Sequence, residues 1–111
     1  MSNRWTLIGI VVERGKADGL VDAARKAGAS GATILYGRGT ATHELLSLFN
    51  IQVNALKEII LILADKEHRS DILKAVVDKG RLEDPGTGIA FTVPVDEVVG
   101  LAYRTKEKPD K

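Results

Sequence analysis

The fold is decided by residues 5–39, WTLIGIVVERGKADGLVDAARKAGASGATILYGRG. Residues 5–13 are β-branched and apolar on both faces, which is typical of a central strand covered on at least one side. Apolar residues then recur at helical spacing, and Gly28 is a candidate C-cap for that helix. They are Leu20, Val21, Ala24 and Ala27. Residues 31–39 predict a second strand that ends in glycines, which completes a strand–helix–strand unit.

A second unit of the same kind follows a long connection. Residues 56–65, LKEIILILAD, predict a strong strand, and residues 68–80 have helical spacing of their apolar positions. The candidate caps of this helix are Ser70 or Asp71 at its start and Gly80 at its end. Residues 81–88 are a turn with proline and glycine, and residues 89–95 predict the fourth strand. We expect a short helical turn in residues 96–104.

Two such units in series predict an α+β, ferredoxin-like βαβ-βαβ domain, in which two helices cover one face of an antiparallel sheet. The other face would be bare. The first strand is nevertheless apolar on both faces, with Ile8, Ile10 and Val12 on one and Leu7 and Val11 on the other. A bare apolar face of this size usually marks a subunit interface, so we expect an oligomer.

Composition excludes several classes of function. A chain of 111 residues with 44% hydrophobic residues is expected to form one globular domain. The net charge of +1 and the aromatic content of 5% do not favour nucleic-acid binding. The absence of cysteine excludes disulfides and thiolate metal sites. No apolar run approaches the length of a membrane span, and we expect a cytoplasmic protein.

Two glycine-containing turns are candidate anion sites. They are YGRGT at residues 36–40 and DPGTGIAF at residues 84–91. Glycine permits positive φ, which lets successive backbone N–H groups point into one concavity where an anion can sit. Neither turn matches a P-loop or a dinucleotide-binding fingerprint, and each by itself is typical of a plain turn. We interpret the two turns as one binding site only if the fold brings them together.

The connection of residues 40–55 carries large apolar residues at helical spacing. Leu45, Leu48, Phe49 and Val53 are the apolar residues at this spacing, and Gln52 falls at the same spacing. The segment either packs on the domain's own core or presents an apolar patch to a partner, and the sequence leaves both open. His43 and His68 have no second ligand at a metal-binding spacing, and we expect surface histidines.

The order of elements, the stretch SGATILYGRG, and GTGIAFTV followed by VDEVV resemble the PII signal-transduction proteins over about residues 4–104. The resemblance implies a domain in residues 1–104, a solvated tail in residues 105–111, and a homotrimer. It also implies an adenine nucleotide (ATP, ADP, AMP or a cyclic nucleotide) bound in clefts between subunits, with no cofactor and no enzymatic activity. A segment called the T-loop would regulate a protein partner, such as a membrane transporter.

The same resemblance implies a role for particular residues. The T-loop would be residues 40–55, and a phosphate-cradling B-loop would be residues 84–89. The implied ligand-binding residues are Thr33 near the base, Gly37, Arg38, Gly39 and Thr40 at the start of the T-loop, Gly86, Thr87, Gly88 and Ile89 in the B-loop, and Arg104. The implied partner-docking residues are Leu45, Leu48, Phe49 and Val53.

The sequence departs from the family pattern where cations usually stand. Ile89 replaces a phosphate-binding lysine, Gly100 and Ala102 align with an arginine pair, and Thr40 and Ala41 open the T-loop. Because these cations are absent, a less charged adenine ligand, such as a monophosphate or cyclic nucleotide, or another small anion is favoured over ATP in the usual geometry. Two alternatives stay open: a ligand-independent interaction module, and a small ferredoxin-like enzyme that uses His43 or His68.

Overall fold

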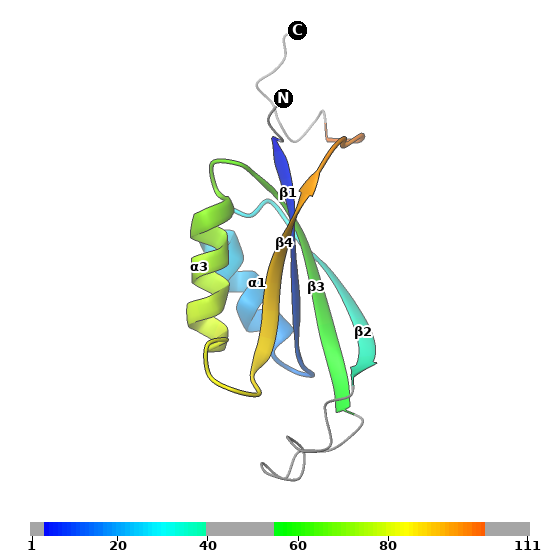
Figure 1. Ribbon diagram of the computed structural model, residues 1–111, viewed down its shortest axis with the longest axis vertical. Helices are drawn as coiled ribbons and strands as arrows, with labels where there is room; N and C mark the ends of the chain where they lie inside the picture. Colours follow the sequence, from blue (N-terminus) through cyan, green and yellow to red (C-terminus); the bar gives the residue numbers. More distant parts are fainter. Residues whose placement is uncertain (1–3, 40–54, 102–111) are drawn as a thin grey trace, which may run out of the picture.

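The computed structural model describes residues 4–39 and 55–101 (Figure 1). Its elements in chain order are β1 (Trp5–Glu13), α1 (Ala17–Lys26), β2 (Thr33–Gly39), β3 (Ala55–Asp65), α3 (Arg69–Gly80) and β4 (Gly88–Val95). The four strands and the two helices predicted within the described residues are all present. The largest difference at a strand boundary is at β2, which begins at Thr33 rather than at residue 31.

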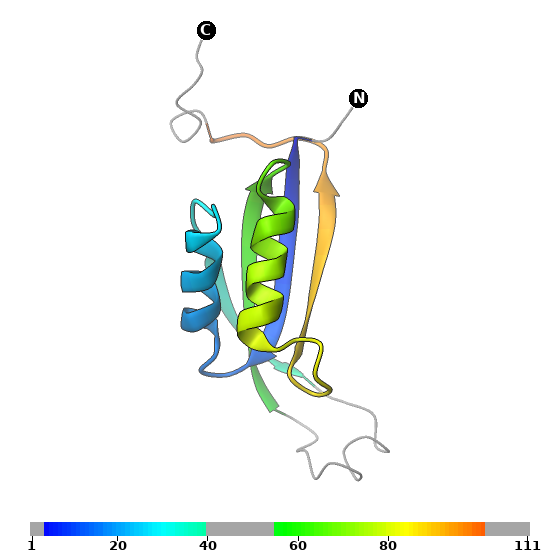
Figure 2. The same cartoon turned by 90° about the vertical axis from the view of Figure 1, so that its left-hand side faces the viewer.

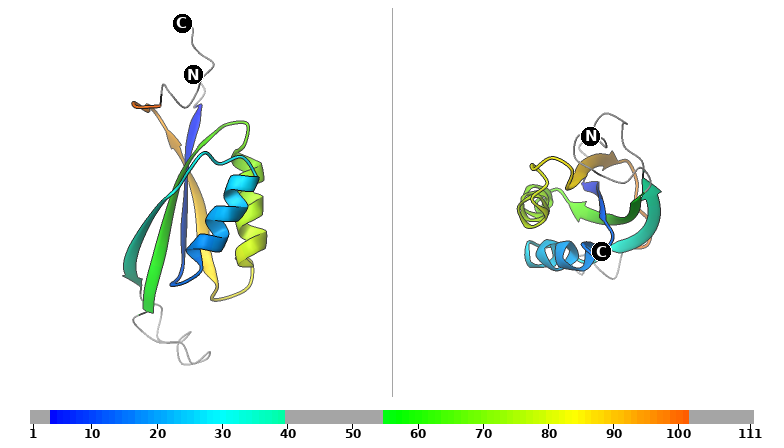
Figure 3. Two further views of the ribbon diagram at one scale, coloured as in Figure 1. Left: turned by 180° about the vertical axis from the view of Figure 1, so that it is seen from behind. Right: turned by 90° about the horizontal axis from the view of Figure 1, so that it is seen from below.

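The four strands form one sheet in the order β2-β3-β1-β4, and every neighbouring pair is antiparallel. α1 connects β1 to β2 across β3, and α3 connects β3 to β4 across β1. Both helices lie on the same face of the sheet, and the view along the strands shows two layers (Figures 2 and 3). This split arrangement confirms the ferredoxin-like fold.

The core lies between the helices and the inner face of the central strands. Register places Ile8 opposite Ile62 and Ile10 opposite Ile60, so alternate residues of β1 and β3 face the helices. The fully buried side chains are Ile8, Ile10, Val12, Leu20, Ile60, Ile62, Ile72 and Val76. α1 contributes its buried face at the helical spacing predicted from the sequence, with Leu20 and Ala24 both buried.

The predicted N-cap of α3 is wrong. The cap is His68, which has no side-chain cap bond, and Ser70 and Asp71 lie within the first turn. The helix starts earlier because Asp65 accepts the His68 backbone N–H through its side chain at 2.9 Å, which closes the turn that leads into α3. The predicted cap at the other end, Gly80, is instead the last helical residue, and the C-cap is Arg81, with a left-handed φ of 52°.

The helical turn predicted after β4 is also wrong within the described part of that segment, residues 96–101, where the chain is irregular. Val99 there is 95% exposed and has no core to pack against. An isolated helical turn without packing is unstable in water, because nucleation fixes several dihedrals for one hydrogen bond. Residues 102–104 lie outside the described residues.

Candidate functional site

One end of the sheet gathers the segments that the sequence singled out. Because the strands are antiparallel, β1 and β2 end where β3 and β4 begin. The β1–α1 loop, the glycine end of β2 and the turn before β4 therefore lie at this end, which is the lower end in Figure 1. We call it the loop end of the sheet.

The glycine end of β2 holds a lysine from the neighbouring strand. Lys57 is opposite Gly37 in register, and its side chain runs over Gly39. A Cβ added at Gly39 would lie 3.0 Å from Cε of Lys57 and 3.1 Å from its Cγ. Glycine at position 39 therefore leaves the space in which the lysine side chain lies.

A pocket of about 240 Å³ opens beside this lysine. It is lined by Arg14, Tyr36, Gly37, Leu56 and Lys57. The backbone N–H of Arg14 donates to the Leu56 carbonyl at 3.2 Å, which ties the start of the β1–α1 loop to β3. The sequence analysis missed the two cations, Arg14 and Lys57. Strand pairing is the signal that could have identified Lys57. This residue lies near the start of β3, and the split topology requires β3 to lie beside β2.

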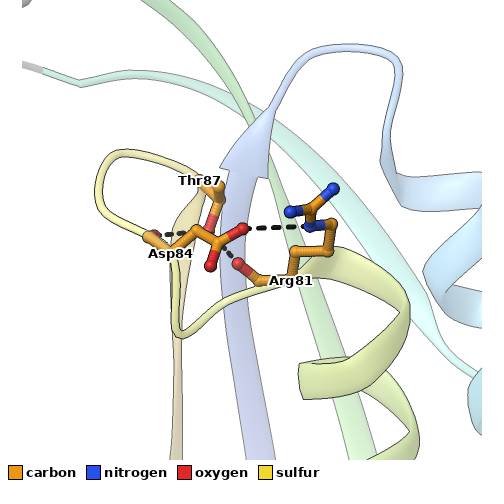
Figure 4. Close-up of polar contacts among 3 residues, drawn as sticks. All are labelled: Arg81, Asp84 and Thr87. Atoms are coloured by element: carbon orange, nitrogen blue, oxygen red, sulfur yellow. Dashed lines mark hydrogen bonds and ion pairs between the residues drawn. The ribbon is translucent and has the colours of Figure 1, made fainter.

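The turn before β4 is a hydrogen-bonded structure (Figure 4). The hydroxyl of Thr87 donates to the carbonyl oxygens of Arg81 at 2.8 Å and of Asp84 at 3.0 Å. The guanidinium of Arg81 donates through Nε to Oδ2 of Asp84 at 2.9 Å. The Thr87 hydroxyl therefore bonds within the turn and holds it closed.

The fold by itself requires glycine in this turn. Gly86 has a φ of 78° and Gly88 a φ of 148°, in the region that favours glycine. A Cβ at Gly88 would lie 2.6 Å from the backbone oxygen of Val11 and 2.8 Å from Cγ1 of Val12. The glycine at position 88 is explained by close strand pairing alone, as the plain-turn alternative expects. A role in ligand binding would be additional.

The two glycine turns lie at the same end of the sheet but at opposite edges, because β3 and β1 stand between β2 and β4. Three strand spacings separate them, roughly 14 Å. Within one chain they do not meet. Thr33 is at the far end of β2, about 20 Å along the strand from Gly39.

The remaining predicted site residues fall into two groups. Ile89 is 60% exposed and lies opposite Val11, on the face of the sheet away from the helices. The others lie outside the described residues. They are Thr40, Arg104, and the predicted docking residues Leu45, Leu48, Phe49 and Val53.

The sheet face away from the helices is apolar, which confirms the sequence prediction. Leu35, Phe91 and Val93 are 43%, 44% and 43% exposed there, from strands at both edges of the sheet. No helix of the described residues covers this face (Figure 3). Single exposed apolar residues are normal on a protein surface, but a contiguous apolar sheet face usually marks an interface.

His68 lies at the other end of the sheet and is half-buried. Its Nδ1 is 2.8 Å from Oδ1 of Asp65, and this hydrogen bond, together with the charge of Asp65, raises the pKa of the imidazole above its usual 6.5.

In the described ranges, no group of three His, Asp or Glu side chains could hold a metal ion. Nor is any helix there long and apolar enough to cross a bilayer. His43 lies outside the described residues.

These features define a ferredoxin-like domain with loop-borne glycine turns at one end and an apolar open face. The family model for nitrogen regulatory protein P-II matches residues 5–107. The chain belongs to the P-II family of signalling proteins, whose members are regulatory proteins.

A solved structure supports the fold. The crystal structure of Arabidopsis thaliana PII bound to citrate superposes with a TM-score of 0.70 at 20% sequence identity, over 96% of this chain and 86% of that one. A search of curated proteins returned no match.

Proposed function

We propose that this protein is a homotrimeric, cytoplasmic P-II regulator that binds an adenine nucleotide or a related small anion between subunits. The T-loop base of one subunit would form one wall of the site, and the B-loop of the next subunit the other. The signal would pass through residues 40–55 to a protein partner, such as a membrane transporter. The protein would have no enzymatic turnover.

One observation carries this proposal. The two glycine turns lie at the same end of the sheet but at opposite edges, so neither can complete a site with the other in one chain. A second copy, joined through the apolar open face, would supply the missing half. A ligand that contacts both turns would then favour one arrangement of the T-loop, and only that arrangement would fit the partner.

The surface of the β2 pocket is almost wholly apolar, but two of the residues that line it carry cations that would contact an anionic group of a ligand. Arg14 and Lys57 line the pocket beside Gly37, and Arg38 is adjacent in β2. These side chains would replace the cations that the sequence lacks at Ile89 and in the C-terminal arginine pair. The relative from Arabidopsis was solved with citrate. A polycarboxylate therefore belongs beside the adenine nucleotides in any ligand screen.

The test is a screen by thermal shift, followed by calorimetric titration, with AMP, cyclic AMP, ADP, ATP and citrate. A ligand that binds only the folded state at 100 times its Kd stabilises it by about 2.7 kcal/mol. We expect Lys57→Gln to weaken binding of the active ligand by about tenfold, as for loss of one charge-assisted contact. The matched control is Lys74→Gln, an exposed lysine on α3.

The B-loop half has its own test. Thr87→Val removes the hydroxyl that closes the turn, whereas Thr87→Ser keeps it. We expect weaker ligand binding for the valine variant and near-normal binding for the serine variant. If none of the five compounds changes the melting temperature, the ligand-independent interaction module replaces this proposal.

A further inference from the structure

We propose that a second cleft, between the start of α1 and the end of α3, binds a compact polyanion with several phosphate groups. The cleft encloses about 480 Å³, within the usual range for small-molecule sites. None of the residues that line the β2 pocket lines this cleft. The cleft shares Asp84 and Thr87 with the B-loop, but its cations lie outside that loop, and the inference does not depend on the nucleotide site proposed above.

Three cations from separate positions line the cleft. Lys16 precedes α1, Lys79 lies in the last turn of α3, and Arg81 follows that helix. Cε of Lys79 lies 3.4 Å from the position that a Cβ would take at Gly19 of α1. The Lys79 side chain therefore reaches across from one helix to the other. Among the described residues, neither Lys16 nor Lys79 forms an ion pair.

Arg81 keeps donors available for a ligand. Its bond to Asp84 uses Nε, which leaves the two terminal nitrogens of the guanidinium for a ligand. The Arg81 side chain is 78% exposed. Its fork of donors matches the oxygens of a phosphate group, while the two lysines act as point charges.

The charge of the lining selects for more than one negative charge. Three cations and the single carboxylate of Asp84 leave a net charge of +2 on the cleft. A ligand with a single negative charge would gain little binding free energy in this exposed site, because the Asp84 carboxylate already pairs with Arg81. A ligand with several phosphate groups can contact Lys16, Lys79 and Arg81 at once.

The backbone favours the same chemistry. Gly15 and Gly19 line the cleft without side chains, so a ligand can approach the chain closely. Thr87 also lines the cleft and bonds to the Arg81 carbonyl, so an occupant would contact the same turn that leads into β4.

The probe is sodium tripolyphosphate, titrated calorimetrically into the full chain at low ionic strength. We expect Lys16→Gln combined with Lys79→Gln to raise the Kd about tenfold, as two exposed charge contacts of about threefold each. The matched control is Lys26→Gln combined with Lys74→Gln, which removes the same charge elsewhere on α1 and α3. We expect that control to stay within twofold of the wild type.

A second pair of variants tests the cleft by adding charge. Gly19→Glu places a carboxylate in the cleft, in the first turn of α1 where it suits the helix dipole. Gly19→Gln has the same size without the charge. Binding that is lost in the glutamate variant and kept in the glutamine variant supports the site.

Three results would overturn the proposal. They are no binding of tripolyphosphate to the wild type, an equal loss of affinity in both double-lysine variants, and a loss in Lys57→Gln alone, which would place the ion in the β2 pocket. Titration of AMP into the Lys16→Gln, Lys79→Gln variant separates the two sites. Unchanged AMP binding there leaves the nucleotide proposal intact whatever the tripolyphosphate result.

Discussion

The ring of Phe91 on β4 lies directly over Gly9 on β1. The two residues are opposite each other in register, on the face of the sheet away from the helices. A Cβ added at Gly9 would lie 2.4 Å from Cζ of Phe91 and 2.6 Å from its Cε1. Gly9 is buried although no helix covers it. The glycine and the aromatic ring therefore fit as a pair at the centre of the open face.

We expect Gly9→Ala to destabilise the protein by about 1–3 kcal/mol, because the methyl group forces Phe91 out of its position. Urea unfolding at a fixed protein concentration measures the change. Phe91→Leu should relieve the clash, so a double-mutant cycle should show coupling between the two positions. Additive effects of the two substitutions would mean that the ring does not depend on the glycine.

Glu58 on β3 caps the N-terminus of α1, although the two are far apart in the sequence. The residue is 8% exposed, and its Oε1 accepts the backbone N–H of Ala17 at 2.8 Å. Glu58→Ala leaves this buried N–H without its partner, and we expect a loss of about 1–3 kcal/mol in the free energy of unfolding. Glu58→Gln keeps an acceptor oxygen and should cost less. Equal losses in both variants would show that the charge, and not the hydrogen bond, matters.

The Asp65–His68 pair makes stability depend on pH. The hydrogen bond that the His68 imidazole donates to Asp65 raises the pKa of His68 above 6.5. Partial burial acts to raise the pKa of Asp65, but the hydrogen bonds from the side chain and backbone of His68 outweigh it, and the net shift is below 3.8. The histidine contribution is present below pH 6.5 and is lost as pH rises through the raised pKa. The aspartate contribution is present above pH 3.8 and is lost as pH falls through the lowered pKa.

We therefore expect wild type to melt at a higher temperature than His68→Gln at about pH 5.5, with a difference that shrinks by about pH 8.5. Melting curves across this range, in one buffer of constant ionic strength, measure it. A difference that grows toward alkaline pH would contradict the assignment of the pair.

The open face provides a test of assembly with a matched control. Val93 lies on this face and is 43% exposed, whereas Val99 lies beyond β4 and is 95% exposed. We expect Val93→Lys to shift the proposed trimer to monomer, because a lysine in an apolar interface loses its hydration. Val99→Lys should leave the mass unchanged. Light scattering at matched concentrations reads both, and a wild-type monomer would remove the basis for a site between subunits.

Local sequence was sufficient to predict the strands and the two helices. The apolar residues on both faces of residues 5–13 predicted β1, and the spacing of Leu20 and Ala24 predicted the buried face of α1. The order of elements then predicted the split topology, because few arrangements of two strand–helix–strand units bury both helices on one sheet. The N-cap of α3 was predicted wrongly because Asp65 reaches forward to the His68 N–H, a contact that composition alone does not reveal.

The candidate site was predicted only in part. Glycine-rich turns are visible in sequence because only glycine adopts positive φ at low cost, as Gly86 and Gly88 do. That Lys57 lies over Gly39, and that Arg14 joins it beside Gly37, depends on which strands are neighbours and in what register.

By itself, then, the sequence determined the strands, the helices, their order and the glycine turns, since each depends on residues close together in the chain. Tertiary structure alone decided that Glu58 caps a helix 41 residues away, that Phe91 covers Gly9, and that the two glycine turns stand at opposite edges of one sheet. The physical reason is that strand register is fixed by pairing and side-chain packing between distant segments, and a shift of one residue would turn every side chain to the other face.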